Sequence, residues 1–147
     1  MVRLGIGLYG TSQGPLALEP VIQLTTTISQ IRHLKKGDTV GYNRAGELLR
    51  DSIIATVRLG YADGYSRQLG LGKGAMWVNG LLAPIVGDIC MDMTMIDVTG
   101  INCREGDQVI VLGKEIDINE LASKIGTISY EVLTGISQRV KRVYFYE

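Results

Sequence analysis

The sequence contains few of the residues on which metal centres and disulfide frameworks are built. Its 147 residues include one histidine, His33, and two cysteines, Cys90 and Cys103. Their spacing matches no pattern typical of a zinc site, and two cysteines are too few for the disulfide framework of a small secreted domain. We therefore expect both cysteines to be reduced, His33 to lie on the surface of a strand, and no metal to be bound.

The sequence also lacks an excess of one charge and a long apolar run. Fifteen Lys and Arg residues balance fifteen Asp and Glu residues, which argues against nucleic acid or an anionic membrane as the main ligand. The apolar stretches, such as residues 53–57 and 109–112, are far shorter than the roughly 20 residues that cross a bilayer. The glycine-rich run at residues 1–10 does not have the features of a signal peptide. These features predict a soluble, cytoplasmic protein.

Glycine is abundant and phenylalanine almost missing, which favours a mainly β fold with tight turns. There are 19 glycines and one phenylalanine, and the β-branched residues come in short runs. Residues 20–34 are rich in Thr and Ile, which lose rotamer freedom in a helix, so a long strand is expected there. Asn79-Gly80 between two apolar runs predicts a hairpin with a type I′ turn. Further strands are expected at residues 39–42, 53–59, 91–98 and 140–146.

One helix is predicted between Asp117 and Gly126. Asp117 can cap its start, Glu120 three residues later completes a capping box, and Gly126 ends it. Its apolar face consists of Ile118, Leu121 and Ile125. We expect this short helix to cover one end of a closed, Greek-key-like β-barrel.

Residues 1–18 do not share the pattern of the rest. A short apolar strand is expected there, followed by a polar, turn-rich connector at residues 10–15. We therefore interpret residues 1–18 as the end of a preceding domain and residues 19–147 as the β-barrel domain. Within that domain, residues 35–38 and 104–107 have similar sequences, and each is expected to form a turn that leads into a strand.

Polar loop segments are the candidates for chemistry. Residues 60–67 combine glycines with two tyrosines, an aspartate and an arginine, residues 88–92 contain two aspartates, and Tyr42 follows a predicted strand. Loops on a rigid scaffold often carry function. Each segment also has a purely structural interpretation. Residues 60–67 could form a turn that covers the end of a barrel, and the aspartates of residues 88–92 could cap the start of a strand. Tyr42 could be an ordinary interface tyrosine, because a phenol with a pKa near 10 is a poor base at neutral pH. Residue chemistry alone leaves both interpretations open.

Five sequence blocks together resemble the alanine racemases. In order and spacing they span essentially the whole chain. The blocks are residues 3–10 (RLGIGLYG), 40–42 (VGY), 60–67 (GYADGYSR), 83–92 (APIVGDICMD) and 136–140 (ISQRV). The resemblance implies an N-terminal (β/α)8 barrel that binds pyridoxal 5′-phosphate through a lysine, followed by a β domain that docks over the barrel of the partner subunit in a homodimer. It further implies interconversion of L- and D-alanine, a small amino-acid substrate, for peptidoglycan synthesis.

The resemblance also implies the residues of the substrate site. Tyr42 matches the tyrosine that, with the lysine on the opposite face, forms a pair of bases for proton exchange at Cα. Met91 and Asp92 match the pair beside the substrate carboxylate, where Met91 would act through its backbone amide. Tyr61 and Arg67 match residues that line the corridor leading to the active site.

The resemblance also implies the residues of the cofactor site, and this chain departs from the family pattern at two positions. Arg3 matches the arginine at the pyridine nitrogen, and Gly5 and Ile6 match the positions whose amides hold the phosphate. Many relatives have an arginine at the corridor position of Asp88 and a phosphate-contacting tyrosine at the position of Gln138. These two replacements leave the preference between alanine and serine open.

None of the lysines of this chain lies in a context that matches the cofactor-binding lysine. The chain alone is therefore expected neither to hold the cofactor covalently nor to racemise alanine. Residues 130–137 resemble the subgroup in which the racemase follows a cell-wall amino-acid ligase domain.

Two other functions fit the same scaffold. Decarboxylases of the ornithine type share the barrel-plus-β-domain plan and use a cysteine and an aspartate from the β domain, which invites a comparison with Cys90. The chain could also be a non-catalytic barrel module. The block at residues 60–64 and Tyr42 favour the racemase.

Overall fold

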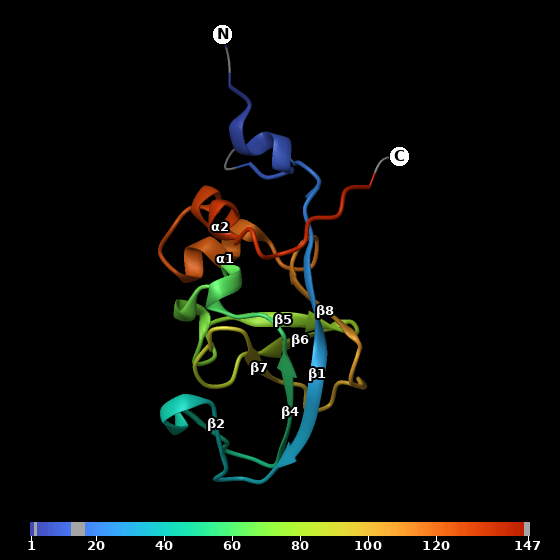
Figure 1. The fold of residues 1–147 in the computed structure, drawn as a ribbon, viewed down its shortest axis with the longest axis vertical. Helices are drawn as coiled ribbons and strands as arrows, with labels where there is room; N and C mark the ends of the chain where they lie inside the picture. The colour runs from blue at the N-terminus through green and yellow to red at the C-terminus, as the bar shows by residue number, and fades with distance from the viewer. Residues whose placement is uncertain (2, 13–16, 146–147) are drawn as a thin grey trace.

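The computed structural model describes residues 1, 3–12 and 17–145, and its main feature is a strongly curved antiparallel sheet with two helices at one end (Figure 1). The strands are β1 (Leu24–Leu34), β2 (Thr39–Val40), β3 (Gly46–Glu47), β4 (Ser52–Val57), β5 (Ala75–Val78), β6 (Leu81–Pro84), β7 (Thr94–Asp97) and β8 (Gln108–Leu112). The helices are α1 (Ile118–Lys124) and α2 (Ser129–Gly135), with short 3-10 helices η1 (Gly5–Tyr9), η2 (Tyr42–Arg44), η3 (Tyr61–Asp63) and η4 (Arg67–Leu69). No helix within the described ranges is long and apolar enough to cross a membrane.

Six strands form a nearly closed barrel in the order β6-β5-β8-β1-β4-β7. The long strand β1 pairs with β8 through its first residues and with β4 through its last, and its register shifts between Ile28 and Gln30. The two edges of the sheet then approach each other, because Ile85 bridges Ile96 and the amide of Val86 donates to the carbonyl of Met95 at 2.9 Å. The expected mainly β, barrel-like fold is confirmed.

The barrel interior is filled by apolar side chains that alternate along the strands. Met76 and Val78 of β5 and Val57 of β4 are completely buried, as the two-residue period of a strand predicts. A second, smaller cluster lies under the β2–β3 hairpin and attaches the turn that carries Tyr42 to the barrel wall. It contains Val40, Leu48, Ile54, Cys90 and Met95.

The predicted turns and the predicted helix are present. Asn79 (φ 44°) and Gly80 (φ 94°) lie between β5 and β6, as a type I′ hairpin requires. In the two similar turns the carboxylate of the fourth residue accepts from the amide of the first, at 2.7 Å for Asp38 and 3.0 Å for Asp107. Helix α1 begins after Asp117, whose carboxylate accepts from the amide of Asn119. The apolar face of α1 packs on the core, so the helix covers the barrel as expected.

Three local predictions were wrong. Residues 5–9 form η1 and not a strand, because Gly5 and Gly10 adopt positive φ, and a Cβ at Gly10 would lie 1.8 Å from the carbonyl oxygen of Glu19, where the chain folds back. The described part of the predicted last strand, residues 140–145, is irregular. A second helix, α2, was not predicted, and its N-cap residue, Ile128, makes no side-chain capping bond. Residues 13–15 of the expected connector and Tyr146 lie outside the described residues.

Candidate active site

Tyr42 projects from a turn whose backbone is unusual. Gly41 (φ 79°), Asn43 (φ 55°) and Arg44 (φ 56°) all adopt positive φ, which reverses the chain within a few residues. The turn lies against the loop before β7, because a Cβ at Gly41 would lie 3.6 Å from the backbone nitrogen of Asp88. The Tyr42 side chain is 72% exposed. The phenol is thus presented outward on a fixed backbone.

The loop that contains Tyr61 is joined to the loop that contains Met91 by backbone hydrogen bonds. The Tyr61 amide donates to the carbonyl of Cys90 at 3.0 Å, and the Ala62 amide donates to the carbonyl of Met91 at 3.0 Å. Gly60 makes this approach possible, because a Cβ there would lie 2.3 Å from both carbonyl oxygens. The side chains of Tyr61 and Met91 remain exposed. Two segments of the predicted site therefore lie side by side.

Asp88 and Cys90 face different environments within one loop. The Asp88 carboxylate lies 4.0 Å from the guanidinium of Arg67, so these two predicted corridor residues form an ion pair. Cys90 is buried; burial and the nearby Asp88 charge raise its pKa, while Arg67 lowers it. A thiol in this position is held protonated inside the small apolar cluster. Cys90 and Cys103 are both free.

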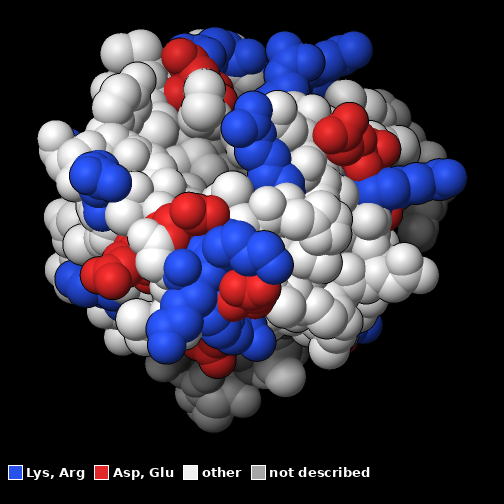
Figure 2. Space-filling model, turned by 90° about the horizontal axis from the view of Figure 1, so that it is seen from below, with Lys and Arg blue, Asp and Glu red and all other residues white. Residues whose placement is uncertain are grey.

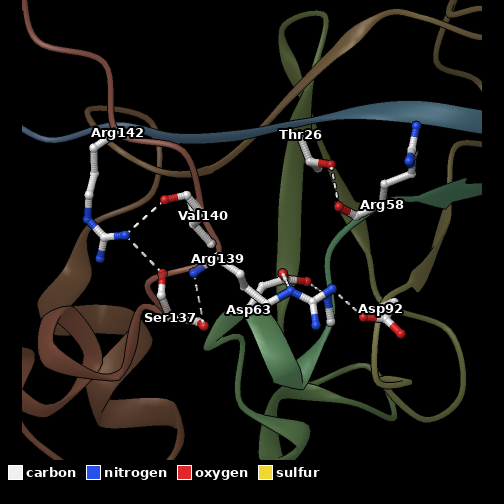
Figure 3. A network of polar contacts seen from close by, with 9 residues as sticks. Thr26, Arg58, Asp63, Asp92, Ser137, Arg139, Val140 and Arg142 are labelled. Carbon is white, nitrogen blue, oxygen red and sulfur yellow. Dashed lines mark hydrogen bonds and ion pairs between the residues drawn. The ribbon is translucent and has the colours of Figure 1, made fainter.

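Arg139 connects the two loops through its guanidinium (Figure 3). Its Nε lies 3.0 Å from Asp63 Oδ1, and its Nη2 donates to Asp92 Oδ1. Asp63 also accepts from the Gly60 amide at 2.9 Å. Arg139 belongs to one of the sequence blocks, but no role was predicted for it. The two aspartates at loop ends were the only signal in the sequence that could have indicated one.

The predicted cofactor residues Arg3, Gly5 and Ile6 lie elsewhere, whereas Gln138 directly precedes Arg139 in the chain. Figure 1 places η1, with Gly5 and Ile6, at one end of the molecule and the turn after β2, with Tyr42, at the other. The amide of Ile6 donates to the hydroxyl of Tyr130 from α2 at 3.3 Å, a contact that was not predicted. Arg3 and Gln138 are exposed. The structure therefore brings Tyr42, Tyr61, Arg67, Asp88, Met91 and Asp92 together and leaves Arg3, Gly5 and Ile6 apart from them.

The group of predicted site residues that contains Tyr42, Tyr61 and Met91 lies on an open surface. A cavity of about 200 Å³ lies between residues 9–12 and the start of α1, and none of the predicted site residues lines it. Charges of both signs are interspersed on the face at the β2 end of the molecule (Figure 2). Within the described residues no group of three or more His, Cys, Asp and Glu side chains could hold a metal ion. A second surface is needed to enclose a small ligand here.

Comparisons with known proteins agree with this geometry. The family described as "Alanine racemase, C-terminal domain" matches residues 21–144. Alanine racemase of Clostridium novyi is 44% identical over 97% of this chain, and that of Sorangium cellulosum is 44% identical over 98%. The chain spans about 40% of the length of these relatives.

Solved structures give the same result. Alanine racemase from Bartonella henselae, solved with covalently bound pyridoxal phosphate, matches 96% of this chain with a TM-score of 0.89 and 35% identity, and the match covers 40% of that protein. Alanine racemase from Streptomyces coelicolor matches 97% of this chain, and 40% of its own length, with a TM-score of 0.90 and 30% identity. This chain belongs to the alanine racemase family and corresponds to its C-terminal domain.

Proposed function

We propose that this chain is the C-terminal part of a cytoplasmic alanine racemase that interconverts L- and D-alanine for peptidoglycan synthesis. In this proposal residues 1–18 end a barrel domain that binds pyridoxal 5′-phosphate, and residues 19–147 form the second domain. The relatives that share most of this chain are alanine racemases, and one of them was solved with the cofactor bound. By resemblance, residues 130–137 also support an upstream cell-wall ligase domain.

The observation that carries the proposal is the separation of the two groups of site residues. The turn after β2, which carries Tyr42, and η1 lie at opposite ends of the molecule (Figure 1), so one copy cannot place both around one substrate. In a homodimer each copy contributes one group to each active site. The exposed Tyr42, Tyr61 and Met91 side chains would then be covered by the partner's barrel.

The residues of η1 fit the phosphate of the cofactor. The Ile6 amide already has an oxygen acceptor at 3.3 Å, the Tyr130 hydroxyl, which is longer than a typical hydrogen bond of this kind. A phosphate oxygen in that position would be a stronger acceptor because it is charged. Gly5, Ile6 and Gln138 would hold the phosphate, and Arg3 would contact the pyridine nitrogen. When bound, the cofactor withdraws electrons from Cα and so acidifies its proton.

The residues of this chain would bind the substrate and move its proton. Tyr42 would take the Cα proton of L-alanine and return a proton in the reverse direction, while a lysine outside this chain would serve the other face. Because a neutral phenol is a weak base, the partner would have to supply a positive charge or hydrogen-bond donors near Tyr42. The Met91 amide would bind the substrate carboxylate beside Asp92. Tyr61, Arg67 and Asp88 would line the corridor.

The paired charges of Arg67 and Asp88 give the corridor no net charge from these two residues. The preference between the methyl group of alanine and the hydroxymethyl group of serine stays open, so both substrates belong in the assay.

The test is Tyr42→Phe in the full-length protein. Loss of a general base typically lowers turnover about 10²–10⁴-fold, and we expect this loss in the L-to-D direction at unchanged folding. Tyr144→Phe is the matched control, because its side chain is 74% exposed and lies outside the site, against 72% for Tyr42. Unchanged kinetics of Tyr42→Phe would support a non-catalytic barrel module instead.

A decarboxylase is the second candidate, and the structure disfavours it. The thiol of Cys90 is buried in an apolar cluster and its pKa is raised, so it is not presented to a partner's substrate as Tyr42 is. Measurement of carbon dioxide release against enantiomer inversion by the full-length protein separates the two reactions.

A further inference from the structure

We propose that Arg139 is a positioning residue of the substrate site, which fixes the Asp92 loop and neutralises Asp92 beside the Met91 amide. This inference rests on the proposed racemase function. It concerns a residue that does not touch the substrate and acts through Asp92.

The guanidinium of Arg139 forms a bridge between two carboxylates (Figure 3). Asp63 is the inner partner, with a side chain only 12% exposed, and Asp92 is the outer partner, at 51%. The hydrogen bond that Arg139 donates to Asp92 and the charge of Asp63 raise the pKa of Arg139, so the guanidinium stays charged. The bridge extends the two backbone hydrogen bonds that already join these loops.

The backbone that carries Arg139 is itself fixed. The Ser137 amide donates to the carbonyl of Asp63 at 3.0 Å. Gly64 lets this segment approach, because a Cβ there would lie 2.3 Å from the carbonyl oxygen of Gly135. The guanidinium of Arg142 donates to the carbonyls of three residues of the segment, at 2.8–3.1 Å. Arg139 is therefore held in place from both sides of its own position in the chain.

The charge of Asp92 makes such a residue necessary. Within the described residues the Met91 amide donates to no acceptor, so it is available for a ligand. A substrate carboxylate bound there would lie close to the carboxylate of Asp92, and two like charges repel. Arg139 donates a hydrogen bond to Oδ1 of Asp92, and its positive charge compensates the negative charge of that carboxylate. Because Arg139 also binds Asp63, it holds the Asp92 side chain toward Asp63.

An arginine suits this role better than a lysine. The planar guanidinium presents several N–H donors in fixed directions, and here Nε and Nη2 reach different carboxylates. An ammonium group is a single point charge on a flexible stem, so it would favour one aspartate at the expense of the other.

The experiment measures alanine kinetics of the full-length holoenzyme with Arg139→Gln, Arg139→Lys and Arg104→Gln. Arg104 is the matched control, because its exposed ion pair with Asp107 lies in a turn before β8, and we expect its loss to change neither kcat nor KM by more than about twofold. For Arg139→Gln we expect kcat/KM to fall about 10- to 100-fold, mainly through KM, because carboxylate binding is lost more than chemistry. Arg139→Lys should be intermediate.

The background Asp92→Asn provides a readout that a purely structural role would not change. If Arg139 acts by neutralising Asp92, the KM effect of Arg139→Gln should shrink to less than about threefold once Asp92 carries no charge. An undiminished effect in that background would overturn the inference. If the Arg139→Gln variant does not fold, Arg139→Lys takes its place, and a wild-type KM of that variant would also overturn the inference.

The wild-type enzyme separates the two proposals. An inactive full-length protein overturns the proposed function and this inference together. An active protein in which Arg139→Gln behaves like Arg104→Gln overturns the inference alone.

Discussion

Replacement of Gly60 by alanine tests whether the Tyr61 and Met91 loops depend on their close approach. Gly60 has extended backbone angles (φ −146°, ψ −165°) that alanine adopts without strain. A Cβ at this position would nevertheless lie 2.3 Å from the carbonyl oxygens of Cys90 and Met91. The substitution is therefore a steric test of the contact between the loops.

The structure sets the size of the effect. Ordinary contact needs about 3.4 Å, so the loops must separate by about 1 Å. That movement breaks the hydrogen bonds that the Tyr61 and Ala62 amides donate at 3.0 Å, each of which contributes about 0.5–1.5 kcal/mol. We expect the free energy of unfolding to fall by about 2–3 kcal/mol, within the typical range for overpacking.

Urea unfolding of the chain followed by circular dichroism measures this change, with an expected decrease of about 1–2 M in the midpoint and an unchanged slope. Gly135→Ala is the control, because a Cβ at the end of α2 meets no atom within 4 Å of the described structure. We expect Gly135→Ala to be neutral or slightly stabilising. A Gly60→Ala chain as stable as this control would refute the steric reasoning.

Three further predictions concern stability and cofactor binding. Tyr65→Phe should leave the free energy of unfolding unchanged or raise it by up to about 1 kcal/mol, because the buried Tyr65 hydroxyl has no hydrogen-bond partner in the described structure and burial raises its pKa; a loss above that size in urea unfolding would contradict this. Although burial opposes ionisation of Asp97, hydrogen bonds from Thr99 and the Arg50 ion pair hold its pKa below the ordinary value. This stabilisation is present above about pH 4, the unfolded-state pKa, and is lost as pH falls through the lower folded-state pKa, so Asp97→Asn should flatten the decline in urea midpoint from pH 5 to 2.5, and an equally steep decline would be inconsistent with it. Pyridoxal phosphate followed by borohydride should give no stoichiometric lysine adduct on this chain, and a mass spectrum with one fully modified lysine would disprove the expectation.

Much of the barrel could be predicted because its signals are local. The turn residues Asn79 and Gly80 need positive φ, the Thr- and Ile-rich stretch favours a strand, and Asp117 caps a helix. Each of these preferences acts within a few residues, so the sequence alone reports it.

The incorrect predictions depend on contacts between distant residues. Val140 to Phe145 alternate like a strand, but the Arg142 side chain folds back to hydrogen-bond the carbonyls of Ile136, Ser137 and Val140. The apolar run at Gly5 to Tyr9 is turned by Gly10, whose neighbour in space is Glu19. No spacing rule reveals either contact.

In the candidate site, too, some residues could be predicted from the sequence and others only from the structure. The roles of Tyr42, Met91 and Asp92 were implied by the resemblance, because a phenol on one loop and a thioether and a carboxylate on another carry no shared pattern. The structure brings these loops to one face and adds Arg139, whose role requires knowing that Asp63 and Asp92 converge. Their chemical roles stay predictions until the kinetic tests are made.

The arrangement separates stability from assembly of the active site. The core of the barrel is filled without the side chains of Tyr42, Tyr61 or Met91, which are exposed. Their backbones are nevertheless fixed, by the positive-φ turn after Gly41 and by the hydrogen bonds between the two loops. In the proposed homodimer few side chains would need to be ordered when the partner covers them, so docking would cost little conformational entropy. Substitutions that prevent dimerisation of the full-length protein should therefore abolish racemisation while this domain remains folded.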